Sequence, residues 1–278
     1  RRGDRLVIDR GRAGDDDRLL YNARDVQVED LGRGLTQTTI FRDDGSRIVT
    51  VRDRYGEIID RRRIGRDGRE IRLIDDRDRY DDRRDRDRRP PPRRSGEDRP
   101  PRGTGSPRDD YSAEPRRARP RVIVDAFEAP PVEAVERPYS LDEIRYSRRL
   151  RDKVRRVDLD TITFDTGSSS IAPTQFGSLQ VVAQAIEDVL DQNPDAVFLV
   201  EGHTDAVGSD NSNLILSDRR AEAVAVALST NFDIPPENLV TQGYGEQDLK
   251  IQTDGPEREN RRVTLRNITS LLQTSDRR

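Results

Sequence analysis

The sequence predicts a mixed α/β protein of the α+β kind: a carboxy-terminal β-α-β-α-β-β domain with helices on a four-stranded mixed sheet, preceded by a small β-repeat region and a disordered linker. Three observations lead to this prediction. Only 31% of the 278 residues are hydrophobic and 38% are charged, which argues against one continuous core. Charges and prolines replace apolar residues between positions 77 and 121. Beyond position 157, apolar residues recur at helix and strand spacing.

These shifts in composition divide the chain into five segments. We expect a β-repeat region at 1–76, a linker at 77–121, a short strand and basic helix at 122–156, a folded domain at 157–270 and a tail at 271–278. Charge follows the same division, because residues 1–156 carry a net charge of +8 and residues 157–268 one of −12. The chain is therefore electrostatically polarised along its sequence.

The β-repeat region contains glycines spaced 11 and 12 residues apart, at Gly45, Gly56 and Gly68. Apolar runs lie at 48–51, 58–59 and 71–74. Asp44-Gly45 and Asp67-Gly68 are dipeptides typical of tight turns, so the period predicts a small β-meander. The opening segment RRGDRLVIDRGR is one more candidate copy. Three such strands are near the minimum for independent stability, so we expect the meander to pair with something else.

The linker at 77–121 holds half of all the prolines, 16 basic and 10 acidic side chains, and almost nothing apolar. Such a composition cannot bury a core, so we expect a disordered or extended tether. Its excess of arginine leaves polyanion binding, to nucleic acid or lipid phosphates, as an alternative to a solvated spacer. We favour the spacer, because alternating Arg and Asp neutralise each other and aromatic residues are scarce.

Between the linker and the folded domain, the apolar run RVIVDAF at 121–127 predicts a short strand. After a proline break, Ser140 and Glu143 have the spacing of a capping box. This spacing predicts the start of a short, basic helix within 140–157.

From residue 158 the pattern becomes regular. We expect a strand at 158–164, a helix at 176–192, a buried strand at 196–202, a second helix from about Ser217 to Thr230, and strands at 238–245 and 261–268. Ser217 is the expected N-cap of the second helix. Phe164 and Leu199 are expected to lie in the core.

Residue counts exclude several kinds of site. Cysteine is absent and His203 is the only histidine, which excludes disulfides, thiolate zinc sites and cysteine nucleophiles and argues against a histidine-based metal cage. We therefore expect no metal and no cofactor. No stretch approaches the roughly 20 apolar residues that a membrane helix needs, so we expect no transmembrane segment in this chain.

The stretch VEGHTDAVGSDNSNLILSDRRAEAVAVAL carries the most specific signal. Asp205 follows a predicted strand, Gly208 permits a tight turn, and Arg220 is expected in the first turn of the next helix. Such a pair forms a receptor for two charges, because the carboxylate accepts an ammonium and the guanidinium binds a carboxylate as a fork. The matching ligand is a zwitterionic amino-acid centre, and we expect both side chains to be accessible to solvent.

The motifs FDTGSSSI, EGHTD, NxxLSxxRA from Asn213 to Ala221, GYGE, and NRRV at 260–263 occur in this order. Together they resemble the OmpA-like peptidoglycan-binding domain of Gram-negative bacteria, over residues 158–268. The resemblance implies that Asp205 and Arg220 hold the free amino-acid end of meso-diaminopimelate in the peptide stem. It further implies that Asn213 and Arg262, the second arginine of NRRV, line the same pocket.

The same residues also have other interpretations. Asp205 and Arg220 could form a plain surface ion pair, and Asn213 could be a turn residue before the helix. A hydrolase that uses His203, Asp205 and Ser217 is a further alternative, but the GxSxG motif of a nucleophile elbow is absent. We therefore expect a binding protein and not an enzyme.

The resemblance predicts non-covalent binding of peptidoglycan through the diaminopimelate of its stem peptide, in the periplasm of a Gram-negative bacterium. Such binding would anchor the outer membrane or an envelope assembly to the cell wall, with 1–76 as a candidate contact for an envelope protein partner. Two alternatives remain open. One is a structural envelope protein whose β-repeats mediate protein–protein assembly. The other is polyanion binding by the arginine-rich amino-terminal half, with nucleic acid disfavoured.

Overall fold

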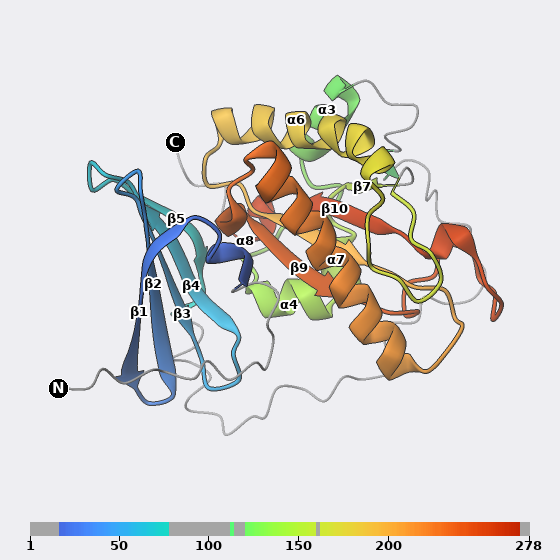
Figure 1. Ribbon diagram of the computed structural model, residues 1–278, viewed down its shortest axis with the longest axis horizontal. Helices are drawn as coiled ribbons and strands as arrows, with labels where there is room; N and C mark the ends of the chain where they lie inside the picture. The colour runs from blue at the N-terminus through green and yellow to red at the C-terminus, as the bar shows by residue number, and fades with distance from the viewer. Residues whose placement is uncertain (1–16, 78–111, 114–119, 160–161, 273–278) are drawn as a thin grey trace.

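The computed structural model describes residues 17–77, 112–113, 120–159 and 162–272. Within them, an antiparallel meander lies beside a mixed sheet, and two long helices cover one face of that mixed sheet (Figure 1). Most of the predicted linker at 77–121, the candidate repeat copy RRGDRLVIDRGR and most of the tail lie outside the described residues.

The meander has five strands that pair in chain order. They are β1 (Ala23–Gly32), β2 (Leu35–Arg42), β3 (Arg47–Arg52), β4 (Ile58–Ile64) and β5 (Glu70–Asp75). The apolar runs predicted β3, β4 and β5 correctly. They did not predict β1 or β2; β1 lies at the edge of the sheet, and half of its residues are polar and exposed.

The repeated glycines form the turns between these strands. Gly45, Gly56 and Gly68 all have φ between +81° and +84°, a backbone conformation that favours glycine. Each glycine N–H donates a hydrogen bond to the carbonyl three residues earlier. The 11- and 12-residue period is therefore a repeat of one turn geometry.

The second sheet has the strand order β6-β7-β10-β8-β9. Its strands are β6 (Ser112–Ala113), β7 (Arg156–Asp158), β8 (Phe198–Gly202), β9 (Leu239–Gly243) and β10 (Val263–Asn267). Strands β8 and β9 are parallel, whereas β10 runs antiparallel to both of its neighbours. With helices α6 (Phe176–Gln192) and α7 (Asp210–Phe232), the predicted β-α-β-α-β-β order on four mixed strands is confirmed, and β6 adds a short fifth strand.

Shorter helices complete the fold. They are α3 (Pro120–Glu128), α4 (Leu141–Tyr146), α5 (Arg148–Arg151) and α8 (Thr269–Leu272), with 3₁₀ turns η2 (Pro173–Gln175), η3 (Pro236–Asn238) and η4 (Arg258–Asn260). The predicted capping box is confirmed at the start of α4, where Ser140 and Glu143 each accept a hydrogen bond from the other's backbone N–H. The predicted basic helix is divided, because Ser147 ends α4 and caps α5.

Three predictions of secondary structure were wrong. The run RVIVDAF is helix α3 and not a strand, because Ile123, Ala126 and Phe127 lie at helical spacing and are buried on one side. The strand expected at 158–164 is β7, which ends at Asp158. The second helix begins at Asp210 with Ser209 as its N-cap, seven residues before the predicted start.

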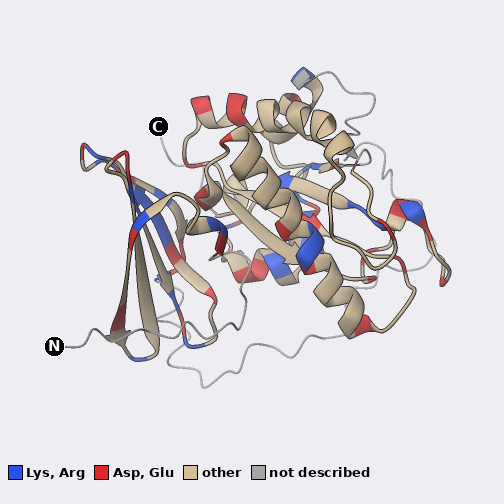
Figure 2. Cartoon of the chain, in the orientation of Figure 1, with Lys and Arg blue, Asp and Glu red and all other residues tan. Residues whose placement is uncertain are grey.

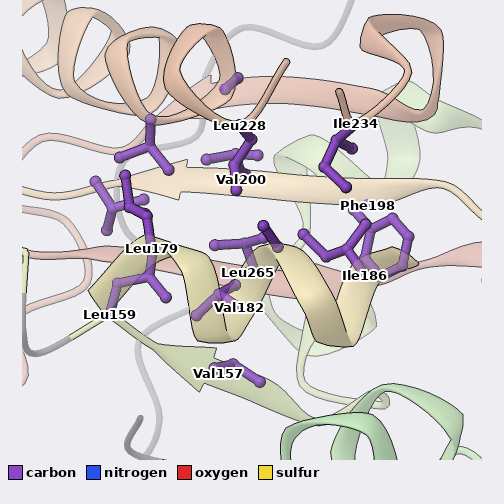
Figure 3. Packing of buried hydrophobic residues seen from close by; sticks show 14 of the residues in the cluster. Val157, Leu159, Leu179, Val182, Ile186, Phe198, Val200, Leu228, Ile234 and Leu265 are labelled. Carbon is purple, nitrogen blue, oxygen red and sulfur yellow. The ribbon is translucent and has the colours of Figure 1, made fainter. Parts of the chain in front are cut away.

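One face of the mixed sheet packs against α6 and α7. In Figure 3, Phe198 and Val200 of β8 and Leu265 of β10 point toward apolar side chains of these helices. The cluster also contains Leu179, Val182, Ile186, Val224 and Leu228. Phe164 belongs to this core as expected. Alternation along β8 then directs Leu199, Glu201 and the following His203 to the opposite face.

The opposite face of the mixed sheet is covered by chain that precedes it. Leu199 and Val240 pack there against Leu141 of α4 and against Leu73 and Ile74 of the meander, in one shared apolar cluster. Leu199 is therefore a core residue, as expected. The meander thus completes a core that the mixed sheet leaves open.

Ion pairs at the edge of the mixed sheet strengthen this docking. The buried Glu237 of η3 accepts from Arg42 at 2.9 Å and from Arg63 at 3.2 Å. Arg18 pairs with Glu222 of α7 at 2.6 Å and also donates to the Leu239 carbonyl. Figure 2 shows that the meander carries both positively and negatively charged residues.

Helix α7 crosses the mixed sheet at very short range. A Cβ atom added to Gly202 would collide with the backbone carbonyl of Ser217. Only glycine fits at this position, because the obstruction is backbone and cannot move aside. This contact sets the height of α7 above β8, and with it the path of the loop that joins them.

We expect Gly202→Ala to destabilise the protein by at least about 3 kcal/mol, since the added methyl group overpacks a backbone contact. Gly177→Ala in α6 is the matched control, because a Cβ there meets nothing within 4 Å. It should raise the free energy of unfolding by a few tenths of a kcal/mol to about 1 kcal/mol. Urea unfolding measures both, and equal effects of the two substitutions would contradict the close contact.

Candidate functional site

The site predicted from the sequence is built on the loop 203–209, which joins β8 to α7. The loop is held at both sides by backbone bonds, from His203 N–H to the Arg262 carbonyl at 3.0 Å and from Thr204 N–H to the Gly245 carbonyl at 2.9 Å. Gly208 has φ +112°, which allows the turn before the N-cap Ser209. The loop is therefore part of the rigid frame that carries Asp205.

Asp205 forms an ion pair, but with Arg261 and not with Arg220. The Arg261 Nη1 donates to Asp205 Oδ2 at 2.7 Å. The Asp205 side chain is 7% exposed and that of Arg261 is 17% exposed. Arg261 is the first arginine of NRRV, and the sequence analysis did not select it. The alternation of side chains along β10 could have pointed to Arg261, because it places Arg261 on the same side of the strand as the core residue Val263.

Arg220 lies in the middle of α7 and is fully buried, whereas we expected a solvent-accessible residue in the first turn. Its guanidinium donates to three carbonyls: Nε to Ser168 at 2.9 Å, Nη1 to His203 at 3.2 Å, and Nη2 to Asp165 at 3.2 Å. Burial lowers the pKa of Arg220 to about 10, against the opposing charge of Asp205. Arg220 therefore ties the loop at 165–168 to the loop that carries Asp205.

Asn213 lies in the first turns of α7 and is buried. Its Nδ2 donates to Glu246 Oε2 at 2.7 Å, in the GYGE turn after β9. Added to Gly245, a Cβ would approach Asn213 closely. Asn213 thus links the start of α7, which follows the EGHTD motif, to the GYGE turn. Both lie at the same end of the sheet.

Arg262 lies on the opposite side of β10 from Arg261. Its Nη2 donates to the Asp248 carbonyl at 2.9 Å, and its surroundings are Asp158, Arg156 and Asp248. The structure therefore brings Asp205, Arg220 and Arg261 together, with Asn213 on the adjoining turn. It does not bring Arg262 into that group.

A buried charge network occupies the same face as Arg262. Glu201 of β8 accepts from Thr264 Oγ1 at 2.6 Å and from Arg266 Nε at 3.0 Å, and it pairs with Arg151 of α5 at 2.9 Å. The Arg151 guanidinium also lies 3.9 Å from the centroid of the Tyr244 ring. Burial by itself would raise the pKa of Glu201, but Arg266 and Arg151 lower it to about 2. Sequence analysis did not find this network, because its members are far apart in the chain.

The geometry does not assemble the hydrolase alternative. Ser217 is fully buried, its hydroxyl donates to the Leu214 carbonyl at 2.7 Å, and it accepts from Gly245 N–H at 2.8 Å. His203 Nδ1 and Nε2 have no hydrogen-bond partner among the described residues. The three side chains therefore do not form the linked hydrogen bonds that a triad needs.

In the described part of the chain, acidic and histidine side chains form no cluster of three that could hold a metal ion. None of the helices in that part combines the length and apolar character needed to cross a membrane.

The comparison with known families gives a match at the same motifs. The sequence pattern of the OmpA family matches residues 163–262. These residues form an OmpA-like domain. The match begins at residue 163, directly before the FDTGSSSI segment, and ends at Arg262, so it spans that segment, the loop, α7, the GYGE turn and the first three residues of NRRV.

Curated relatives match the carboxy-terminal part of the chain. Outer membrane porin F of Pseudomonas aeruginosa is 36% identical over 94 residues, which are 34% of this chain and 25% of the porin. The probable lipoprotein YiaD of Escherichia coli is 30% identical over 133 residues, 42% of this chain and 58% of the relative. Peptidoglycan-binding protein ArfA of Mycobacterium tuberculosis is 30% identical over 118 residues, 42% of this chain and 35% of the relative.

Each alignment thus covers less than two thirds of the relative's own length. Among solved structures, the peptidoglycan-associated lipoprotein from Burkholderia pseudomallei is 28% identical, with a TM-score of 0.32, and the match covers 37% of this chain and 86% of that chain.

Arg220 is expected to be needed for folding as well as for the site. Replacing it by alanine removes a donor from three carbonyls, of which that of Asp165 keeps the Ser168 N–H, and opens a buried space. Together these changes should cost about 3 kcal/mol or more. Its exposed neighbour Arg219 is the matched control, and Arg219→Ala should change stability by less than about 0.5 kcal/mol. Chemical denaturation measures both variants. A normal melt for Arg220→Ala would contradict its carbonyl contacts.

Glu201 should make stability depend on pH. Its pKa is about 2 in the folded protein and 4.5 is the reference value, so its contribution is fully present above about pH 4.5 and is lost as pH falls toward 2. The size is roughly 3 kcal/mol. Because other carboxylates titrate in the same range, the measurement is the difference between the protein and Glu201→Gln from pH 5 to pH 2. The two plots of unfolding free energy against pH should converge at low pH. Parallel plots would show that Glu201 does not form stabilising ion pairs with Arg151 and Arg266.

Proposed function

We propose that this protein binds peptidoglycan non-covalently through its OmpA-like domain. The observation that carries the proposal is the Asp205 carboxylate, which a rigid loop presents beside two arginines at the end of a sheet. The name of the mycobacterial relative, peptidoglycan-binding protein ArfA, points to the same ligand. In this proposal the domain acts as a binding module, without a chemical step.

The proposed ligand group is the free amino-acid end of meso-diaminopimelate in the stem peptide. Its ammonium replaces Arg261 at Asp205, because both are cations that one carboxylate can accept. The released Arg261 guanidinium then binds the ligand carboxylate as a fork. The buried Arg220 guanidinium adds positive electrostatic potential at the ligand carboxylate from the interior of the domain. Asn213 and Glu246 hold the adjoining wall of the site. The exchange of one ion pair for another explains how a nearly buried carboxylate can still be a receptor.

The proposed cellular role is to anchor the outer membrane, or an assembly of the envelope, to the cell wall from the periplasm. Names of two relatives, an outer membrane porin and a probable lipoprotein, suggest this location. The polyanion alternative receives less support, because arginines of the meander pair with neighbouring carboxylates, such as Arg72 with Glu70 and Asp75 at 2.9 Å each. Anchoring by a local pocket should also weaken gently with salt, whereas polyanion binding collapses steeply.

The test measures the binding of two stem peptides to the full chain, one containing diaminopimelate and one containing lysine at the same position. The diaminopimelate peptide should bind at least about tenfold more tightly, because lysine within a peptide presents its side-chain ammonium without the second carboxylate for an arginine fork. Asp205→Asn keeps the shape of the side chain and removes its charge, so it should lose binding of the diaminopimelate peptide and of purified sacculi. Calorimetric titration and co-sedimentation with sacculi supply the two measurements.

Asp191→Asn is the control, since this carboxylate lies exposed at the end of α6 and should not affect either measurement. The thermal melt of each variant shows whether it is folded. Sacculus binding that survives in a folded Asp205→Asn protein would overturn the proposed function. Equal affinity for the lysine and diaminopimelate peptides would overturn the role of the arginines but leave Asp205 as a receptor for an ammonium.

A further inference from the structure

A small cleft lies on the face of the mixed sheet that α6 and α7 do not cover. Its lining comes from three places: the segment 148–156, called here the α5 segment because it begins with α5; the loop at 248–250 after β9; and side chains of β8 and β10 on that same face. Glu201, Thr264 and Arg266 form its floor. The α5 segment lies outside residues 163–262, so part of this cleft is built by chain beyond the OmpA family match.

The charges around the cleft do not balance. Four carboxylates are each in contact with two cations: Asp152 with Arg148 and Arg266, Asp158 with Arg156 and Lys250, Asp248 with Arg148 and Arg151, and Glu201 with Arg151 and Arg266. Glu259 also pairs with Lys250 at 3.4 Å, so these five cations and Arg262 lie among five carboxylates. Within the described residues, Arg262 is the cation of this group to which no carboxylate comes within 4 Å.

Arg262 also has unused hydrogen-bond donors. It is 5% exposed, and its Nε and Nη1 have no partner among the described residues, while Nη2 donates to a carbonyl. Burial of a guanidinium with two orphan donors is costly unless an acceptor is present. His203, which also lines the cleft, adds two ring nitrogens without a partner. The wall therefore offers donors beside an uncompensated positive charge.

The size of the cleft limits what can satisfy these groups. Its cavity volume is about 30 Å³, which is room for about two water-sized groups and so for the two oxygens of one carboxylate. Guanidinium groups bind carboxylates as a planar fork, and Lys250, which also lines the cleft and is 26% exposed, can guide an anion inward. Size and charge are thus both compatible with a carboxylate.

We infer that this cleft is a second binding site, specific for a carboxylate group at the end of a peptide or on a small organic acid, with Arg262 as its anchor and Lys250 at its mouth. It is separate from the site of Asp205. Consecutive residues Arg261 and Arg262 point to opposite sides of β10, and neither Asp205 nor Arg220 lines the cleft. The inference stands independently of peptidoglycan binding.

The single histidine provides a direct probe. His203 gives the one imidazole signal of the chain in an NMR spectrum, and it lies in the wall of the cleft. Burial and the nearby charge of Arg262 hold the pKa of His203 well below its usual value. A bound carboxylate would offset part of that charge, so it should move the imidazole signal and raise the pKa of His203.

The experiment titrates the full chain with sodium acetate, glycylglycine and glycylglycinamide at constant ionic strength, with sodium chloride and sodium phosphate as reference ions. Acetate should move the His203 signal in a saturable manner at concentrations on the order of millimolar, because so small a ligand binds weakly. Glycylglycinamide, which lacks the carboxylate, should not. A response to glycylglycine as well identifies a peptide end as the source, and a response to acetate alone identifies a small acid.

Variants locate the response. Arg262→Gln should weaken acetate binding about tenfold or more, since it removes a charge-assisted pair. If Arg262→Gln fails to fold, Lys250→Gln is the second variant and should weaken binding several-fold. Arg69→Gln, at an exposed turn of the meander, is the matched control, and Asp205→Asn should leave the response intact. No saturable shift with acetate, or an equal shift with chloride or phosphate, overturns the inference, and so does an undiminished response in folded Arg262→Gln or Lys250→Gln.

Discussion

The mixed sheet has two faces to bury, and this constraint organises the rest of the molecule. Helices α6 and α7 cover one face, and the crossing of α7 over Gly202 sets how closely they do so. The second face is equally apolar at one end, around Leu199 and Val240. Leaving it open would expose a contiguous apolar patch, which soluble proteins rarely tolerate. The α4 segment and the meander cover it, and thereby become part of the same structural unit.

Arginine supplies most of the polar contacts that hold this arrangement together. A guanidinium stays charged when buried and offers five donors in a fixed plane, so one side chain can satisfy several carbonyls. Arg220 bridges two loops in this way, and Arg266 bridges β10 to the end of α5. Lysine could not replace either one, because an ammonium has three donors on a single nitrogen and cannot contact several separated carbonyls in one plane. The chain has 49 arginines and two lysines, in keeping with this use of guanidinium groups.

The two faces of the sheet also separate two kinds of chemistry. The α6 and α7 side carries Asp205, which pairs with Arg261 and is the proposed receptor for an ammonium. The other side carries Arg262, a buried guanidinium with two donors that have no partner among the described residues. The NRRV motif contributes to both faces, because neighbouring residues in an extended chain point in opposite directions. A single substitution in this motif should therefore affect one site without reaching the other.

The sequence by itself determined what depends on local spacing: the glycine turns of the meander, the capping box at Ser140, the span of α6, and the position of Asp205 in the loop after β8. Only the tertiary structure decided the partners. RVIVDAF became a helix because Phe127 packs edge-on against Phe198 at 5.1 Å, although its β-branched residues suggested a strand. Asp205 took Arg261 as its partner while Arg220 turned to three carbonyls. Alternation along β10 indicates the side of the strand on which Arg261 lies. It cannot predict which arginine pairs with Asp205, because a guanidinium binds any oxygen that the fold brings within reach.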